Sequence, residues 1–245
     1  MPRARREPPS TDSGPSLRAV PFFAQSDAGP VSLLNRRQRQ RLTEISTRVR
    51  VPPRMVLYRE DTVATTMFFN AGGVVKTFRD LPSGRRWVTG FFFPEDVFGL
   101  AQNGVYVRTA QTVTEATLYR VKTEVLAELL RNDPDLEYQF LVKAAHELRE
   151  AQRQALVVGR RDAVGRVAMF IRQLEQRGVR HASGGGLEID MPMTRSDVAN
   201  YLGLSPEAVS RATRMLERRG IVKFTERHRV RIVDRLQFDR LVARV

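Results

Sequence analysis

The sequence contains no cysteine. This absence excludes disulfide bonds, thiolate-bound zinc, iron–sulfur clusters held by cysteine and thiol-based redox sensing. Histidine is also scarce, since only His146, His181 and His228 occur, and they lack the spacing of metal ligands. We therefore expect no metal site and no cofactor.

Long apolar runs are missing as well. No stretch approaches the ~20 consecutive apolar residues of a membrane span, and the charged N-terminus lacks the apolar core of a signal peptide. An enzyme would need a nucleophile beside a base or a pair of carboxylates, and the sequence shows neither arrangement. We expect a cytoplasmic protein with no catalytic residues and no membrane partner.

Positive charge exceeds negative charge. The 41 basic residues outnumber the 27 acidic ones, for a formal net charge of +14, and 37 of the basic residues are arginine. Arginine donates paired hydrogen bonds to phosphate and guanine, which suits a nucleic-acid partner, although an arginine-rich genome composition would produce the same excess. Residues 159–245 carry a net charge of +8 and residues 31–158 a net charge of +5. The final third of the chain is therefore the more basic per residue.

The chain changes character near residue 30. Residues 1–30 hold six of the 13 prolines, which predicts a disordered arm that is solvated or touches DNA non-specifically. A short helix is expected over residues 35–46. From residue 49 to residue 121, short apolar runs are separated by turn residues, which predicts six or more strands in a β-sandwich or roll.

Residues 132–159 have the pattern of one long helix, with Asn132 or Asp133 as its cap and Pro134 in its first turn. Apolar residues recur in steps of three and four, as along the seam of a two-stranded coiled coil: Leu141, Ala144, Leu148, Ala151, Ala155 and Val158. The seam favours a homodimer, and the alternative is a stripe that packs on the chain's own β-domain. A second helix follows over residues 161–177, and Gly178 is placed to end it.

Residues 194–216 have the spacing of a helix-turn-helix. Such a unit needs a small residue where the helices cross, a glycine in the turn, and an apolar residue that packs back on the first helix. Ala199, Gly203 and Val209 stand at these offsets. Thr194 is placed to cap a first helix over residues 195–202, which follows a short strand over residues 187–192. Ser205 and Pro206 are placed to begin the second helix.

The second helix carries polar residues on the face opposite to Val209, Ala212 and Leu216. The N-terminal half of such a helix enters the major groove, where arginine reads guanine and glutamate accepts from cytosine. We expect Glu207, Ser210 and Arg211 to read bases, although a Glu/Arg pair four residues apart is also a common surface ion pair. Two strands around a basic turn follow over residues 220–234 and predict a wing. The expected phosphate contacts are Thr194, Arg195, Ser205, Arg214, Arg227 and His228.

This order of parts resembles the CRP/FNR superfamily of bacterial transcription regulators. The resemblance covers residues from about 35 to 240, and it rests on three segments: LLRNDPDL, VGRRDAVGRVAMFI and MTRSDVANYLGLSPEAVSRATRMLERRGIV. It implies an α+β fold with four parts. These are a disordered arm (1–30), a cyclic-nucleotide-binding-like β-roll (31–128), a dimerisation helix (129–158) and a C-terminal winged helix-turn-helix (159–245).

Within that superfamily, the second helix is similar to the FNR and FixK type, in which the pattern E-x-x-S-R reads TTG…CAA half-sites. Glu207, Ser210 and Arg211 match this pattern, and Pro206 stands where the cyclic-AMP receptor branch has arginine. Cyclic-nucleotide binders of this fold hold the ribose with Gly-Glu-Leu, whereas this chain has Leu100 at the glutamate position. Arg108 and Thr109 remain as a possible phosphate-binding pair, and an apolar roll interior is expected around Leu100.

The resemblance therefore implies a FixK-like activator that binds palindromic DNA as a homodimer, recruits RNA polymerase and needs no effector. Members of this type control genes for oxygen limitation, nitrogen fixation or denitrification. The alternative is a regulator gated by a cyclic nucleotide or another small molecule in the β-roll.

Overall fold

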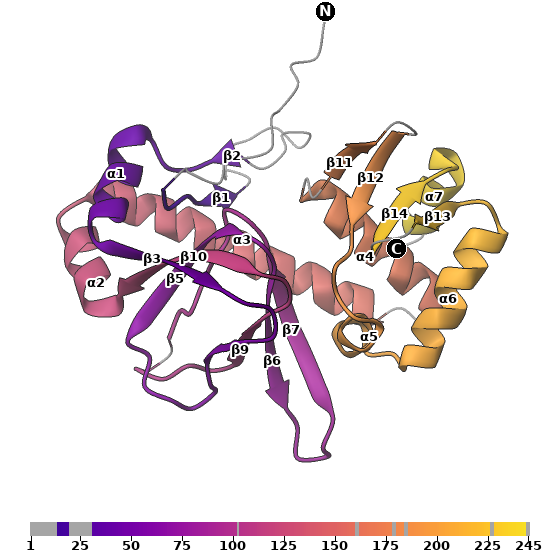
Figure 1. The fold of residues 1–245 in the computed structure, drawn as a ribbon, viewed down its shortest axis with the longest axis horizontal. Helices are drawn as coiled ribbons and strands as arrows, with labels where there is room; N and C mark the ends of the chain where they lie inside the picture. The colour runs from indigo at the N-terminus through magenta and orange to yellow at the C-terminus, as the bar shows by residue number, and fades with distance from the viewer. Residues whose placement is uncertain are drawn as a thin grey trace, which may run out of the picture. The chain divides into compact units, whose positions relative to one another are not determined.

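The structure is a computed structural model, and it describes residues 14–19, 31–101, 103–159, 162–177, 180–183, 186–225 and 228–243. The chain divides into two compact units (Figure 1). The first comprises Met1–Thr77 and Phe91–His146, and the second Phe78–Gly90 and Glu147–Val245.

Two four-stranded sheets form the β-roll, with strand orders β3-β10-β5-β8 and β4-β9-β6-β7. The strands are β3 (Ser46–Val51), β4 (Val56–Tyr58), β5 (Thr66–Gly72), β6 (Val75–Asp80), β7 (Arg86–Phe92), β8 (Val97–Phe98), β9 (Thr109–Thr112) and β10 (Ala116–Lys122). Gly73 and Gly84 have φ angles of 83° and 76°, so each supplies the left-handed backbone that its turn needs. The expected roll is confirmed, and it includes β3, which begins before the predicted start of the strands.

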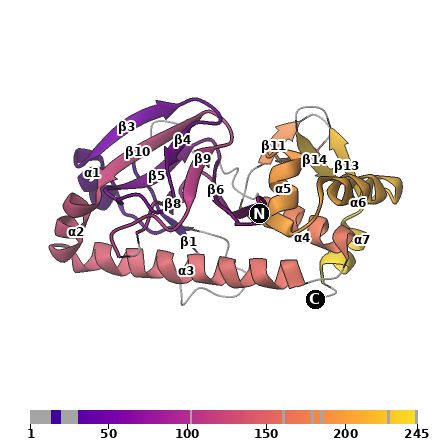
Figure 2. The same cartoon turned by 90° about the horizontal axis from the view of Figure 1, so that it is seen from below.

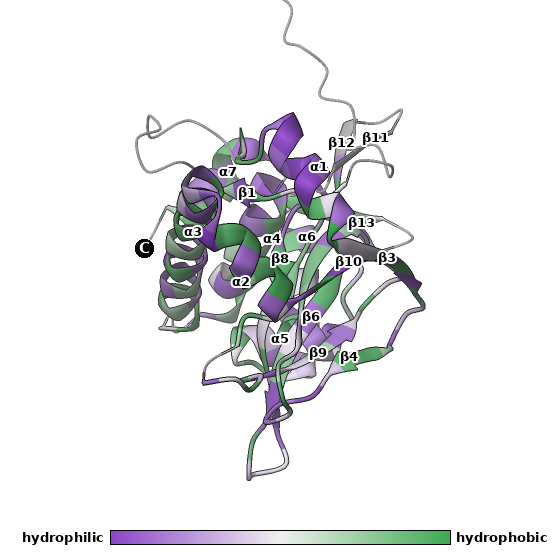
Figure 3. Cartoon of the chain, turned by 90° about the vertical axis from the view of Figure 1, so that its left-hand side faces the viewer, coloured by the Kyte–Doolittle hydropathy of each residue, from purple (hydrophilic) through white to green (hydrophobic). Residues whose placement is uncertain are grey.

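Three helices accompany the roll. The helix α1 (Arg36–Glu44) begins at Asn35, whose side chain accepts from Gln38 N at 2.9 Å. Figure 3 shows α1 as hydrophilic along most of its length, and Leu42 is the buried apolar residue that holds it to the roll. The sequence analysis did not predict α2 (Thr123–Arg131) as a helix of its own. Because α2 occupies residues 129–131, the predicted start of the dimerisation helix at residue 129 was too early.

The long helix α3 (Pro134–Gly159) is continuous (Figure 2). Of the two proposed caps, Asp133 is the one that acts at its start, where its carboxylate accepts from Leu136 N at 3.0 Å. Asn132 instead ends α2. The helix presents one face to the core of the first unit through Leu136, which is fully buried.

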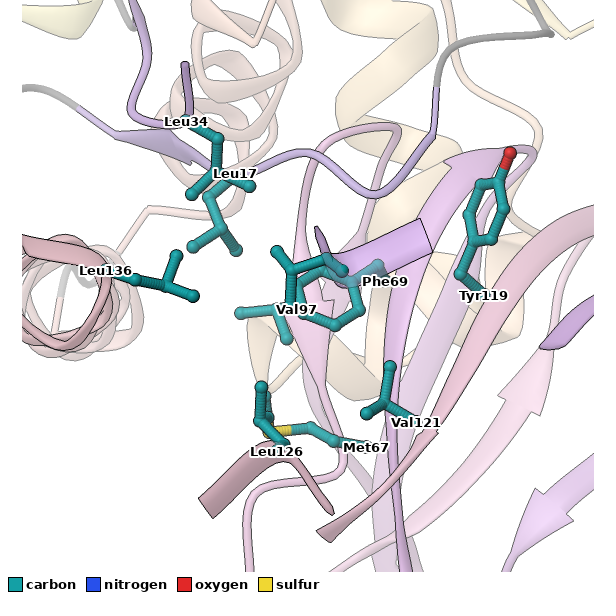
Figure 4. Close-up of a cluster of buried hydrophobic side chains, with 10 residues drawn as sticks. Leu17, Leu34, Met67, Phe69, Val97, Tyr119, Val121, Leu126 and Leu136 are labelled. Carbon is teal, nitrogen blue, oxygen red and sulfur yellow. The ribbon is translucent and has the colours of Figure 1, made fainter. Parts of the chain in front are cut away.

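The interpretation of residues 1–30 as a disordered arm is wrong for residues 14–19. Strand β1 (Arg18–Ala19) pairs with β2 (Val31–Ser32), and Leu17 is 0% exposed. Figure 4 shows Leu17 and Leu136 pointing toward the same space beside Phe69 and Val97. Local composition did not reveal this packing, because the cluster around Leu17 includes Phe69 and Leu136, which lie far from it in the chain. Residues 1–13 and 20–30 of the predicted arm lie outside the described residues.

The second unit contains a winged helix. Its sheet has the order β11-β12-β14-β13. The elements are α4 (Ala163–Gln176), β11 (Arg180–Ser183), β12 (Gly186–Asp190), α5 (Arg195–Leu202), α6 (Pro206–Arg218), β13 (Val222–Thr225), β14 (Arg229–Ile232) and α7 (Arg235–Val242). The predicted helices and wing strands are therefore present. The predicted terminator Gly178 lies outside the described residues, and α4 ends at Gln176 with Arg177 as its cap.

Candidate nucleic-acid interface

The turn between α5 and α6 is closed by backbone bonds and by an arginine from α4. Gly203 has φ 64° and ψ 38°, the left-handed conformation of a helix C-cap. Arg166 Nη1 donates to the carbonyl oxygens of Leu202 and Gly203 at 2.8 and 3.2 Å, which satisfies acceptors left free at the end of α5. Sequence reasoning missed Arg166, because no local pattern links a residue on α4 to a turn 36 residues later.

The second helix starts as its sequence indicates. Ser205 Oγ accepts from Ala208 N at 3.1 Å, and Pro206 occupies the first turn, where no backbone donor is needed. Val209, Ala212 and Leu216 are 2%, 2% and 0% exposed. The predicted inward face of α6 is confirmed.

The opposite face of α6 is polar and accessible. Glu207, Arg211 and Arg214 are exposed, and Ser210 is half-buried. The pKa of Glu207 is lowered by its own backbone N–H, by the Ser205 hydroxyl and by the charge of Arg211. A carboxylate in the first helical turn is also favoured by the helix dipole. The exposed face of α6 thus presents one carboxylate and two guanidinium groups to solvent.

The start of α5 lies beside this face. Thr194 Oγ1 accepts from Asp197 N at 3.0 Å and so caps α5. Arg195, the first residue of the helix, is exposed, and its Nη1 donates to Ser210 Oγ at 2.9 Å. The structure therefore brings together Arg195 at the start of α5 and Ser210 of α6. Both residues were predicted to contact DNA, but the bond between them was not predicted.

The wing between β13 and β14 is less free for phosphate contacts than its basic sequence suggests. Arg229 Nε binds Asp190 Oδ1 at 3.0 Å, and Arg231 Nη2 binds Glu188 Oε1 at 2.8 Å. These two arginines are therefore neutralised within the sheet. His228 is exposed, and its carbonyl accepts from Met191 N at 2.7 Å. The predicted phosphate contact Arg227 lies outside the described residues.

An apolar stripe is exposed along α3. Five of the six predicted seam residues are exposed: Leu141, Ala144, Leu148, Ala151 and Ala155. The sixth, Val158, is half-buried and lies near Gly203 of the helix-turn-helix. Leu156 is 60% exposed and extends the stripe, although the sequence analysis omitted it. Leu156 follows Leu148 by eight residues, a spacing that places two residues on one face of a helix. This spacing could have predicted that Leu156 belongs to the stripe.

Aromatic rings fill the space between the two sheets of the roll. Tyr58 stacks on Tyr106 with ring centroids 3.8 Å apart, and Phe68 stacks on Phe98 at 5.2 Å. Phe92 adds a third contact, 5.2 Å from Phe98. Burial raises the pKa of the Tyr58 hydroxyl, so this interior holds neutral rings.

The two possible ligand residues differ in their surroundings. Thr109 Oγ1 accepts from Glu60 N at 3.0 Å and thus joins two parts of the roll, whereas Arg108 is exposed. The prediction that Leu100 marks the apolar interior was wrong, because its side chain is 55% exposed. Gly99 explains this position: its φ of 86° turns the chain away immediately after β8.

Within the described ranges, no helix is long and apolar enough to cross a membrane.

Two protein-family comparisons match most of the folded chain. Residues 48–133 match the cyclic nucleotide-binding domain family, and residues 165–241 match the Crp-like helix-turn-helix domain family. These ranges correspond to the roll and the winged helix. The fold and the two domains define a DNA-binding transcription regulator.

Curated relatives and solved structures agree with that class. The chain is 33% identical to the nitrogen fixation regulation protein FixK of Azorhizobium caulinodans over 185 residues, covering 76% of this chain and 75% of that protein. It is 32% identical to the transcriptional activatory protein AadR of Rhodopseudomonas palustris, covering 81% and 82%. The structure of FixK2 from Bradyrhizobium japonicum has a TM-score of 0.75 and 29% identity, covering 82% of this chain and 99% of that one.

The chain belongs to the CRP/FNR family of transcription regulators. Within this family it is similar to the FixK proteins, so the resemblance found from the sequence is confirmed. The relatives are transcription regulators and not enzymes.

Proposed function

We propose that this regulator is a FixK-like activator that binds a TTG…CAA-type palindrome as a homodimer and needs no small-molecule effector. The observation that carries the proposal is the face of α6 that bears Glu207, Ser210 and Arg211 on a correctly capped helix. The role as an activator is supported by relatives that are transcriptional activators, such as AadR. RNA polymerase is the partner that an activator of this kind recruits.

Base reading is assigned to three residues of α6. Arg211 donates to guanine O6 and N7, Glu207 accepts from cytosine N4, and Ser210 bonds a neighbouring base edge. Glu207 is exposed and ionised at neutral pH, as an acceptor of this kind must be. The half-site sequence follows from the similarity of these residues to the FNR and FixK pattern. Phosphate contacts are assigned to the remaining predicted residues: Thr194, Arg195, Ser205, Arg214, Arg227 and His228.

The homodimer is supported by the exposed stripe on α3. Leu141, Leu148 and Leu156 are 65%, 63% and 60% exposed, and such side chains at helical spacing are stabilised by burial against a second helix. The small residues Ala144, Ala151 and Ala155 between them permit close approach. Because a two-fold symmetric dimer binds two identical half-sites, we expect its DNA site to be a palindrome.

Effector independence is supported by the interior of the roll. The aromatic rings of Tyr58, Phe68 and Phe98 occupy the space between the sheets. Cyclic-nucleotide binders of this fold hold the ribose with a glutamate, and the residue at the matching position here is Leu100, which is exposed and supplies no carboxylate.

The proposal is tested by selecting binding sites from a pool of random duplexes with the purified full chain, first without effector and then with cyclic AMP. We expect the enriched sequences to share a two-fold symmetric TTG…CAA pattern. Enrichment of an asymmetric sequence would overturn the dimer and the palindrome. Enrichment that requires cyclic AMP would favour the ligand-gated alternative.

A further inference from the structure

The contact between Arg195 and Ser210 joins the two helices of the helix-turn-helix at the surface where DNA is expected. Arg195 Nη1 and Ser210 Oγ are 2.9 Å apart, the usual length of an N–H···O hydrogen bond. The two residues are 15 positions apart in the chain, so the bond depends on the packing of α5 against α6. It links a residue expected to touch phosphate to a residue expected to touch a base.

The chemistry of the pair fixes the direction of the bond. A guanidinium group has five N–H donors and no acceptor, so Ser210 Oγ must accept. A serine hydroxyl on a helix otherwise rotates among its staggered positions, or bonds back to the carbonyl of the preceding turn. With one lone pair bound to Arg195, the oxygen is held in place and its hydrogen remains available to a partner outside the helix.

We propose that Arg195 is a positioning residue for base recognition, which makes the Ser210 hydroxyl a hydrogen-bond donor toward the major groove. The partners of such a donor are acceptor atoms on base edges: purine N7, guanine O6 and thymine O4. This inference rests on the proposed base-reading role of α6. It changes the role of Arg195, because a pure phosphate contact carries no sequence information.

The local geometry supports a held side chain. Arg195 follows the cap Thr194 directly, so its backbone is fixed by the first turn of α5. Thr213 Oγ1 donates to the Ser210 carbonyl at 3.0 Å, so this part of α6 is also held. The remaining N–H groups of Arg195 are free to bind a phosphate at the same time, and one guanidinium can therefore align the helix on the backbone and orient Ser210.

The test is a double-mutant cycle on DNA discrimination with the full chain. The variants are Arg195→Met, Ser210→Ala and the double variant, with Arg214→Met as a control that removes a predicted phosphate contact from the same face. Binding is measured on the selected operator and on its single-base substitutions, at several salt concentrations. Thermal melting confirms that each variant is folded.

We expect Arg195→Met and Ser210→Ala to reduce discrimination at the same base pair by about fivefold or more. The double variant should discriminate at that base pair about as well as either single variant, with a coupling factor of about three or more. Two base analogues then identify the acceptor: a 7-deaza purine lacks N7, and a thymine analogue can lack O4. The analogue that removes the acceptor of Ser210 should weaken DNA binding by the native protein and leave DNA binding by Arg195→Met unchanged. Arg214→Met should weaken all sequences alike.

Additive effects would overturn the inference. In that case Arg195→Met would lower affinity for every sequence equally and reduce the salt slope by about one, as removal of a phosphate contact does. If the native protein shows no sequence preference at all, the proposed function fails and the inference fails with it. If the native protein binds specifically but the effects of the two substitutions are additive, the positioning role of Arg195 is excluded and the proposed function stands.

Discussion

Lys143 Nζ lies 2.9 Å from Asp96 Oδ1, and the two side chains are 2% and 8% exposed. The same ammonium donates to the carbonyl of Arg18 at 3.0 Å, and the second carboxylate oxygen accepts from Phe93 N at 2.9 Å. One buried ion pair therefore joins α3, the turn before β8 and the N-terminal segment that carries Leu17. The first unit is held together at this point by charge as well as by its apolar core.

Removing one partner of this pair is expected to destabilise the protein strongly. Lys143→Met removes the ammonium that pairs with a buried carboxylate, which costs about 3–5 kcal/mol of unfolding free energy. Adding Asp96→Asn to that variant removes the buried carboxylate charge and should recover part of the loss. Urea unfolding followed by tryptophan fluorescence and circular dichroism measures both. The control is Lys122→Met, an exposed lysine on β10, for which a change within about 0.5 kcal/mol is expected. A loss of that small size for Lys143→Met would contradict the assignment.

Acid should weaken the winged helix through Glu188. Hydrogen bonding from Arg231, and the charges of Arg231 and Arg229, lower the pKa of this carboxyl. A carboxyl with a lowered folded-state pKa stabilises the fold fully above its unfolded-state pKa, and this contribution disappears as the pH falls through the folded-state value. The melting temperature of the native protein should therefore exceed that of Glu188→Gln by a constant margin near neutral pH. This difference in melting temperature should shrink in the acidic range.

Melting curves from about pH 7 to about pH 3 measure that margin. Glu128→Gln serves as the control, since Glu128 is exposed on α2. A margin between the native protein and Glu188→Gln that grows toward acid would show the opposite sign and refute the prediction.

The dimer is tested by placing a charge in the exposed stripe. Leu148→Lys is expected to give a monomer with an intact β-roll, because two lysines would face each other across the seam. Operator binding should weaken by about 10²–10⁴-fold, since the two half-sites would no longer be bound together. Sedimentation measures the mass and circular dichroism the fold. Leu236→Lys is the matched control, because Leu236 on α7 is 62% exposed and Leu148 is 63% exposed. An unchanged dimer for Leu148→Lys would exclude the seam.

Arg211 and Arg214 should differ in the kind of binding they supply. Arg211→Ala is expected to cost about 1–3 kcal/mol and to flatten the preference at one guanine, whereas Arg214→Ala should weaken all sequences and lower the salt slope by about one. A panel of single-base operator variants at two salt concentrations separates these effects. Arg120→Ala, an exposed arginine on β10, controls for lost charge alone. Equal behaviour of Arg211→Ala and Arg214→Ala across the panel would refute the base-reading assignment.

The helix-turn-helix was predictable because its signals are local. The cap Thr194, the left-handed Gly203 and the starting pair Ser205 and Pro206 act within a few residues of where they stand, and each does so in the structure. The stripe on α3 was predictable for the same reason, because its apolar residues recur in steps of three and four along the sequence.

The contacts that were not predicted are tertiary. Lys143 and Asp96 are 47 positions apart, and Arg166 and Leu202 are 36 apart, so no repeat or cap connects them. Leu17 is fully buried in a cluster with Phe69 and Leu136, which lie far from it in the chain. Glu188 and Arg231 are recognisable as partners only once β12 and β14 are known to be neighbours.

A fluorescence-anisotropy titration of the full chain measures whether α6 recognises bases without an effector. The DNA is a TTG…CAA palindrome or a scrambled duplex of the same composition, without ligand and then with cyclic AMP. We expect the palindrome to bind about 10³-fold or more tightly than the scrambled duplex, and we expect cyclic AMP to change neither affinity. Specific binding that appears only with cyclic AMP would contradict effector independence, and equal affinity for the two duplexes would contradict base recognition by α6.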